Sequence, residues 1–341
     1  LNQFVSWGMP YMIGRLYFSD LEGLGELAMG IFVGGLVYLP FVLFEARMSP
    51  QLHTWVYGFH QHQFAQARRA GGWRPTVFMQ HGLAVALFMG TSALCGFWLW
   101  QGARQRMLGL WGACVPMVIP VLVLLAVAAV CRSTYALMLM VIGLAVLTGT
   151  KVVRTKALLW VLLCVAPSYL FARTIGGWDA QLLRDIAAII DASRAHSLVV
   201  RLDSENVGWR LMQNSLVFGD GRMDRVMLHE AAGARFIPDG LWLIVLVKSG
   251  LVGLVSLYAC LLLPVLSYLW RRSWTAIASP LFAGSTVIAV VLILYSLDCL
   301  LNAMVNPIFL LGAGGLAGLG SGAVAPMRSV NNNLLSGVSR A

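Results

Sequence analysis

The chain has 341 residues, of which 59% are hydrophobic and only 11% are charged. A soluble globule of this size needs more polar surface, so the composition excludes a soluble enzyme or binding module and indicates an integral membrane protein. The formal net charge is +10. Its basic residues are scattered between apolar runs and form no continuous groove, so we expect no nucleic-acid partner.

Eight apolar runs follow one another along the chain. About 20 apolar residues cross a bilayer as a helix, and the runs do not show the short alternating segments of an outer-membrane barrel. We therefore expect an all-α polytopic transmembrane bundle with about eight spans. The expected spans cover residues 22–44, 75–100, 107–130, 134–150, 157–174, 240–270, 275–297 and 300–324. Because the chain begins at Leu1 rather than Met, we also expect segments upstream of it.

Basic residues in the short connections predict the orientation of these spans. Arg104, Lys151 and Arg271 lie in alternate short connections, which by the positive-inside rule face the cytoplasm. The two long segments then lie on the opposite side, since long loops cross a membrane largely regardless of charge. The expected parts are N-terminal helices at 1–174 with an external loop at 45–74, a large periplasmic loop at 175–239, and C-terminal helices with a cytoplasmic tail at 240–341.

The larger loop is expected to contain helices of its own. Apolar residues at helical spacing within 178–192 predict an amphipathic helix that lies at the membrane surface. A second helix is expected over 204–216, with Asp203 or Ser204 as its N-cap. The glycine-rich residues 218–221 predict a turn after it.

Two further patterns have plain structural interpretations. Gly314, Gly318 and Gly322 repeat at every fourth position of an apolar run, which predicts close packing of helix backbones. His53, His60 and His62 cluster near Glu45, but an exposed loop without a second carboxylate is a weak metal signal. The six cysteines form no CxxC pair, so neither a disulfide framework nor a zinc site is expected. We also expect no cofactor and no other metal.

Polar residues gather at the expected outer ends of the spans. His81 is placed about two turns inside the span 75–100, near Arg74, where an ionisable group faces either a cavity or a structural partner. Asp298 and Asn302 stand one helical turn apart, so they either bind substrate or bond neighbouring helices. Glu45 and Arg173 are expected at the same membrane face.

Asp239 opens the apolar run 240–270 after a loop rich in arginine. Its carboxylate could cap the helix N-terminus, where the helix dipole favours negative charge. Alternatively it acts on a lipid-borne substrate whose phosphate meets the arginines, although surface ion pairs remain an alternative for each of these. The candidate arginines are Arg201, Arg210, Arg222 and Arg225.

The order of these motifs resembles the O-antigen ligase and polymerase superfamily of membrane glycosyltransferases. The stretch RLDSENVGWRLMQNSLVFGDG precedes a polar residue that opens a span running into KSGLVGL. The segments PYMIGRLYF, GWRPTVFMQHGLAVALFM and SLDCLLNAMVNPIFLLGAGGLAG are similar to blocks of the exopolysaccharide polymerase branch. The resemblance covers most of the chain. Ligases tend to open that span with a histidine, and Asp239 stands there instead, which favours a repeat-unit polymerase over an O-antigen ligase.

The resemblance implies glycosyl transfer at the periplasmic face of a bacterial inner membrane, without a metal. The donor would be a glycan on a polyprenyl diphosphate, and the acceptor a second glycan or a lipid-linked one, with membrane lipid and other polysaccharide assembly proteins as partners. Arg201 occupies the position of the family's arginine and would stabilise the developing charge on the diphosphate. Asp239 would accept the proton of the acceptor hydroxyl. His229 is the alternative base, and a third possibility is that neither residue is.

Two other classes of function stay open. A transporter or flippase of the same lipid-linked glycan would place charges at mid-depth in several spans and contain inverted repeats. Here Lys248 is the main charge inside a span. A structural subunit of a polysaccharide export complex is the other alternative, and it predicts that substitutions of Asp239 or Arg201 affect assembly rather than turnover.

Overall fold

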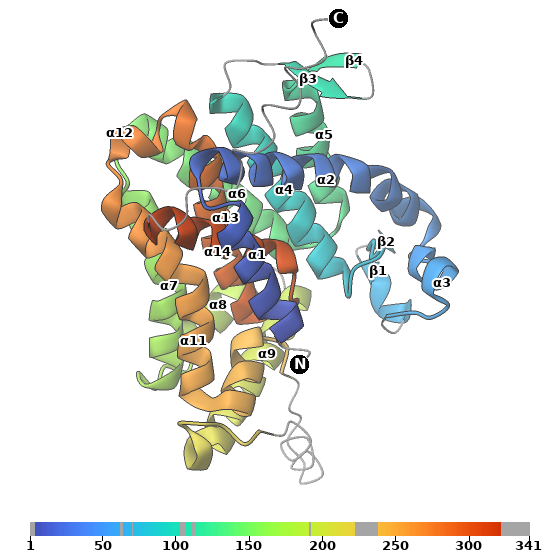
Figure 1. Cartoon of the computed structure of the whole chain (residues 1–341). Helices are drawn as coiled ribbons and strands as arrows, with labels where there is room; N and C mark the ends of the chain where they lie inside the picture. The colour runs from blue at the N-terminus through green and yellow to red at the C-terminus, as the bar shows by residue number, and fades with distance from the viewer. Residues whose placement is uncertain are drawn as a thin grey trace, which may run out of the picture.

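The computed structural model describes residues 4–61, 64–69, 71–102, 107–110, 113–190, 192–221 and 238–321. These residues form a helical bundle with two small β-hairpins (Figure 1). The α-helices are α1 (Met9–Tyr17), α2 (Leu21–Met48), α3 (Leu52–Tyr57), α4 (Gly82–Gly102), α5 (Val118–Val130), α6 (Thr134–Val153), α7 (Ala157–Thr174), α8 (Gln181–Ile190), α9 (Ala192–Met212), α11 (Leu241–Arg271), α12 (Trp274–Ile277), α13 (Ala283–Leu301) and α14 (Pro307–Ser321).

The remaining elements are short. The antiparallel strands β1 (Arg68–Arg69) and β2 (Gly72–Trp73) pair Arg68 with Trp73, and β3 (Met107–Leu110) and β4 (Ala113–Pro116) pair Met107 with Pro116. A π-helix covers η1 (Phe4–Gly8), and 3₁₀ turns cover η2 (Phe64–Ala67), η3 (Gln213–Ser215) and η5 (Pro280–Phe282).

Within the described residues, six helical segments are long and apolar enough to cross a membrane. They are Leu21–Met48, Gly82–Gly102, Thr134–Val153, Ala157–Thr174, Leu241–Arg271 and Pro280–Leu301. The chain is therefore a multi-pass membrane protein, as its composition predicts. The other two expected spans contain α5 and α14, helices of 13 and 15 residues. At 1.5 Å per residue these are about 20 and 23 Å long, short of a hydrocarbon core of about 30 Å, so the count of eight stays a prediction.

Prolines account for both short helices. The run 107–130 begins as the β3–β4 hairpin rather than as helix, and Pro116 favours extended backbone before it, so α5 begins only at Val118. The run 300–324 is interrupted where α13 ends at extended Asn302, with φ −132° and ψ 151°. Pro307 then opens α14, a position at which its missing amide hydrogen costs nothing.

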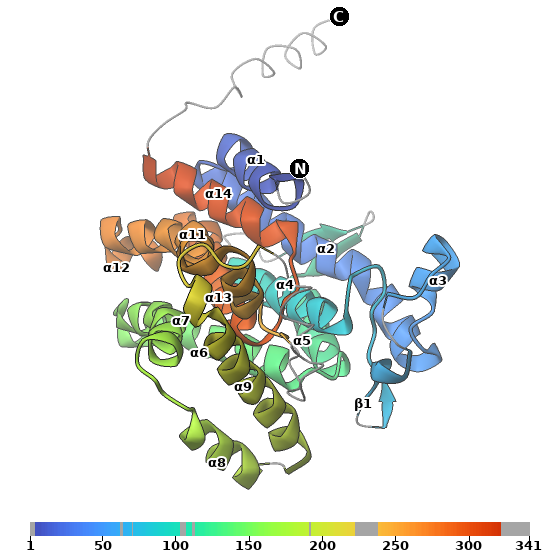
Figure 2. The ribbon, with the colours of Figure 1, turned by 90° about the horizontal axis from the view of Figure 1, so that it is seen from below.

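The centre of the bundle consists of α4 and α13 (Figures 1 and 2). In each of these two segments, 83% of an apolar stretch of 18 residues is buried inside the protein, against 33% to 39% for the other four candidate spans. A helix that is apolar all round belongs in such a centre. The other four keep apolar side chains on their outer faces, as contact with lipid requires.

Close glycine packing joins the two ends of the described chain. Helices α1 and α14 lie side by side (Figure 2). A Cβ at Gly14 would overlap the Leu311 carbonyl, and one at Gly314 would overlap the Tyr11 carbonyl oxygen. Gly318 contacts Arg15 and Ser19 in the same way. The predicted packing role of Gly314 and Gly318 is confirmed, and Gly322 lies outside the described residues.

The described part of the segment before Asp239 contains two helices, α8 and α9, which stand out from the bundle as a pair (Figure 2). Helix α8 falls within the predicted range and carries exposed Leu182 and Ile189. Helix α9 begins at Ala192 rather than at 204, so Asp203 and Ser204 lie inside it and the predicted cap is wrong. The Ser204 hydroxyl instead donates to the Val200 carbonyl.

Helix α11 is broken at Gly250, whose φ is 62° and ψ −161°. A Cβ at Gly253 would lie 3.3 Å from Val245 Cγ1. On a straight helix, residues eight apart are about 12 Å apart. The chain therefore folds back sharply at Gly250, so the candidate span Leu241–Arg271 consists of a short helical segment before the break and a longer one after it.

Candidate functional site

Arg201 and Asp239 form an ion pair across two separate elements. Arg201 lies on α9, and Asp239 lies two residues before the first residue of α11. The Arg201 Nε donates to Asp239 Oδ2 at 3.0 Å. The N-cap residue of α11 is Gly240 and no side chain bonds there, so the capping interpretation of Asp239 is wrong. The side chains are 25% and 42% exposed, which leaves the pair accessible.

A buried network fixes α9, and therefore Arg201, in place. Arg173 of α7 donates from Nε to Glu205 Oε2 at 2.8 Å, from Nη1 to the Trp178 carbonyl and from Nη2 to the Leu202 carbonyl. The Tyr169 hydroxyl donates to the same Glu205 oxygen. Burial raises the pKa of the Glu205 carboxyl, even though Arg173 lies beside it. Arg173 is thus a positioning residue rather than a free cation of the site.

Asp298 and Asn302 end α13 close to the start of α11. The Asn302 amide Nδ2 donates to Asp298 Oδ1 at 2.6 Å, and the Leu241 backbone amide donates to the Asn302 carbonyl at 3.1 Å. Both side chains are buried. Arg201 lies within electrostatic range of Asp298. The structure therefore brings this pair to the Arg201–Asp239 junction, while its mutual hydrogen bond fits the structural interpretation.

Arg74 adds a second guanidinium near Arg201. It lies in the segment before α4, and its Nη2 donates to the Arg132 carbonyl at 3.0 Å. Its Nε is buried and has no hydrogen-bond partner among the described residues. Burial, together with the nearby Arg69 and Arg201, lowers the pKa of Arg74 to about 10. Such crowding of positive charge is expected of a place that receives an anion.

Arg132 helps to position Arg74, and the sequence patterns do not single it out. It follows α5 in a left-handed backbone conformation, with φ 53°. Its Nη1 donates to the Arg69 carbonyl at 3.0 Å and its own carbonyl accepts from Arg74, which ties the β1–β2 hairpin and the segment after it to the connection between α5 and α6. In the sequence it lies between two apolar runs, where a basic residue is typical of an ordinary connection. Only the contact with β1, 63 residues away in sequence, indicates its role.

His81 is not two turns inside a span. Helix α4 begins at Gly82, and the His81 Nδ1 accepts the Leu83 amide at 3.0 Å, as an N-cap does. The preceding segment is non-helical because the buried Glu45 carboxylate accepts the amides of Thr76 and Val77 at 2.8 and 2.7 Å. His81 is therefore part of the helix start, and the expected depth is wrong.

Arg210 does not reach the junction. It lies nine residues after Arg201 on α9, which at about 100° per residue is two and a half turns, so it is on the opposite face. Its side chain is exposed. Arg222, Arg225 and His229 lie outside the described residues.

The loop that carries His53 and His60 is held in place by hydrogen bonds. His53 Nδ1 bonds the Phe59 carbonyl at 2.9 Å, and His60 Nε2 bonds the Pro50 carbonyl at 3.1 Å. Glu45 also accepts the Leu52 amide. Among the described residues, no group of three or more His, Cys, Asp or Glu could hold a metal ion, and His62 lies outside them.

The predicted turn after α9 is present and is paired with the break in α11. The Asp220 and Gly221 amides donate to the Val247 and Lys248 carbonyls, at 2.9 and 3.2 Å. In return, the amides of residues 251 and 252 donate to the carbonyls of residues 216 and 217. These four bonds satisfy backbone groups that the break would otherwise leave unpaired. The sequences FGDG (218–221) and KSG (248–250), which belong to the stretches that resemble the superfamily, thus form one structural unit.

The site is a junction of the starts of α4 and α11, the middle of α9 and the end of α13. Arg201 and Asp239 form an ion pair there, and Arg74 and Asp298 lie within electrostatic range of Arg201, beside the apolar helices of the bundle. Such a site can bind a phosphate-bearing head group and present a carboxylate to it. No model of a known protein family, no curated protein and no solved structure matches the chain.

Proposed function

We propose that this protein is a membrane glycosyltransferase that polymerises or transfers glycan units carried on a polyprenyl diphosphate. The observation that carries the proposal is the accessible Arg201–Asp239 pair, with the Arg74 guanidinium nearby, at the ends of apolar helices. A lipid-linked donor has the matching chemistry, because its diphosphate needs cations and its tail needs an apolar surface. The proposed location is the periplasmic face of a bacterial inner membrane, with 175–239 as the external loop.

The ion pair also suggests how binding could prepare the reaction. A diphosphate competes with Asp239 for Arg201, since bidentate phosphate contacts suit a guanidinium. Once Arg201 turns to the phosphate, the Asp239 carboxylate is free to accept a proton. The acceptor hydroxyl oxygen then bonds to the anomeric carbon, its proton goes to Asp239, and the bond from that carbon to the diphosphate oxygen breaks. The polyprenyl diphosphate leaves with the electron pair, stabilised by Arg201 and Arg74.

Chain lengthening in reconstituted vesicles tests the proposal. The unmodified protein should extend a synthetic polyprenyl-diphosphate oligosaccharide without added metal. Asp239→Asn should lower the rate about 100-fold or more, as for the loss of a general base, and Arg201→Ala by a similar factor. Asp203→Asn is the matched control, because Asp203 also pairs with an arginine, Arg184 at 2.7 Å, on the exposed side of α9. Equal loss in the control would contradict the proposal.

A transporter or flippase of the same lipid-linked glycan is the second candidate. The break of α11 at Gly250 favours it, because interrupted helices line the substrate sites of many transporters. The vesicle experiment separates the two candidates. If glycan crosses the bilayer without becoming longer, Asp239 and Arg201 belong to a transport path. Transfer to a lipid acceptor without repeated extension would instead indicate a ligase.

A further inference from the structure

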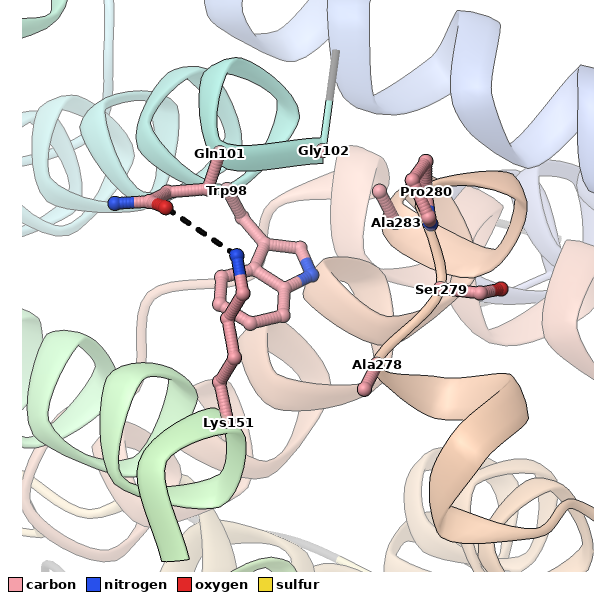
Figure 3. Close-up of a pocket in the computed structure, with 8 residues that line it drawn as sticks. All are labelled: Trp98, Gln101, Gly102, Lys151, Ala278, Ser279, Pro280 and Ala283. Carbon is pink, nitrogen blue, oxygen red and sulfur yellow. Dashed lines mark hydrogen bonds between the residues drawn. The ribbon is translucent and has the colours of Figure 1, made fainter. Parts of the chain in front are cut away.

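A cavity lies apart from the Arg201–Asp239 junction, where α4 and α6 end and α13 begins (Figure 3). Its volume is about 200 Å³. Its lining comes from three separate stretches of chain: Trp98, Gln101, Gly102, Lys151 and 278–280 with Ala283. These are ends of spans that the positive-inside argument places at the cytoplasmic face.

The cavity contains a buried donor without a partner. Trp98 is 5% exposed, and its Nε1 has no hydrogen-bond partner among the described residues. Figure 3 shows this nitrogen on the side of the indole ring that faces Pro280 and Ala283. A buried indole N–H normally finds an acceptor, and leaving it unpaired costs roughly 1–3 kcal/mol. The lining thus offers a place for an acceptor atom.

One lysine and one helix N-terminus bring positive charge to the same space. The Lys151 ammonium lies 5.9 Å from the centre of the Trp98 ring and donates to Gln101 Oε1 at 3.4 Å, a long bond that a stronger acceptor could replace. Helix α13 begins at Ala283, in the lining, and no side chain caps its N-terminus. The positive end of its dipole therefore adds to the field of Lys151. None of the eight described residues that line the cavity is acidic.

We propose that this cavity binds a phosphate group. Lys151 supplies the charge, the Trp98 indole N–H supplies a fixed donor, and the start of α13 supplies a favourable field. Because the cavity lies at the ends of membrane helices, two ligands can bring a phosphate group to it: the head group of an anionic phospholipid and free phosphate. Basic pockets between membrane helices are typical places for anionic head groups. The site is independent of the Arg201–Asp239 junction and of the proposed transferase activity.

Two substitutions test the two donors separately. Lys151→Gln removes the charge, and Trp98→Phe removes the indole N–H together with part of the ring system while keeping one aromatic ring. Each should weaken phosphate binding roughly tenfold, the effect of losing one charge-assisted hydrogen bond. The matched control is Arg154→Gln, which removes one charge from the same helix end at an exposed residue outside the cavity lining.

The measurements use the full chain with two probes. Native mass spectrometry counts phosphatidylglycerol molecules retained from vesicles of phosphatidylcholine and phosphatidylglycerol, and the thermal midpoint in detergent reports the effect of inorganic phosphate. Retention of phosphatidylglycerol that falls in both cavity variants, but not in Arg154→Gln, assigns the site to a lipid. A midpoint rise with phosphate alone, lost in the same two variants, assigns it to a free anion. If the cavity variants match Arg154→Gln with both probes, the proposal is wrong.

Discussion

Gly219 and Gly250 lie directly against each other where the turn after α9 meets the break in α11. A Cβ at Gly219 would stand 2.6 Å from the Gly250 amide nitrogen, and one at Gly250 would overlap the Val217 carbonyl oxygen. Both residues have a positive φ, 74° and 62°. The turn and the break are therefore mutually dependent, and together they set where α11 reverses relative to α9.

Substitution of Gly250 by alanine should destabilise the protein. Its φ and ψ lie in a region open essentially to glycine alone, so a side chain costs about 1–3 kcal/mol before the overlap with Val217 is counted. Gly30→Ala is the control, since α2 offers that Cβ open space. The thermal midpoint in detergent should fall for Gly250→Ala and stay unchanged or rise for Gly30→Ala. Equal midpoints in the two variants would mean that the break is not required.

The buried Arg173–Glu205 pair should matter more to stability than the exposed Arg184–Asp203 pair. Glu205→Gln leaves a buried guanidinium without its counter-charge, at a cost of about 3–5 kcal/mol. Asp203→Asn should cost less than about 1 kcal/mol, because Asp203 is half exposed. Denaturant titration in mixed micelles measures both. A similar small loss in each variant would show that α9 does not depend on this network.

Contact between α1 and α14 should fail when Gly314 gains a large side chain. Gly314→Leu places atoms where the Tyr11 carbonyl lies, so the two helices must separate. Protease cleavage near the N-terminus measures the separation of the two helices. Cleavage should become faster in Gly314→Leu and not in Gly30→Leu, and equal rates would contradict the packing.

Pyrophosphate should stabilise the protein through Arg74 and Arg201. A ligand that binds only the folded state at 100 times its dissociation constant adds about 2.7 kcal/mol. Arg74→Gln and Arg201→Ala should each lose most of the resulting rise in thermal midpoint. Arg210→Ala should keep it, because that side chain lies on the opposite face of α9. If Arg210→Ala loses as much of the rise in thermal midpoint as Arg201→Ala does, the anion binds elsewhere.

The sequence predicts the membrane class and most helices because apolar runs report burial in lipid directly. It does not predict the break at Gly250, since glycine occurs in many intact membrane helices. It marks Arg201 and Asp239 separately but not as a pair, because 38 residues separate them. The sequence does not single out Glu205 for a related reason: in a polar loop a glutamate is normally solvated, and only the contact with Arg173 reveals that Glu205 is buried.

The charge-swapped double variant Arg201→Asp with Asp239→Arg tests the central claim most directly. It keeps an ion pair between α9 and the start of α11 but exchanges the cation and the carboxylate. We predict that the purified double variant is as stable as the unmodified protein, yet does not lengthen a polyprenyl-diphosphate oligosaccharide in vesicles. Restored lengthening in the double variant, with both single variants inactive, would show that the pair only holds the two elements together and would contradict a direct role in glycosyl transfer.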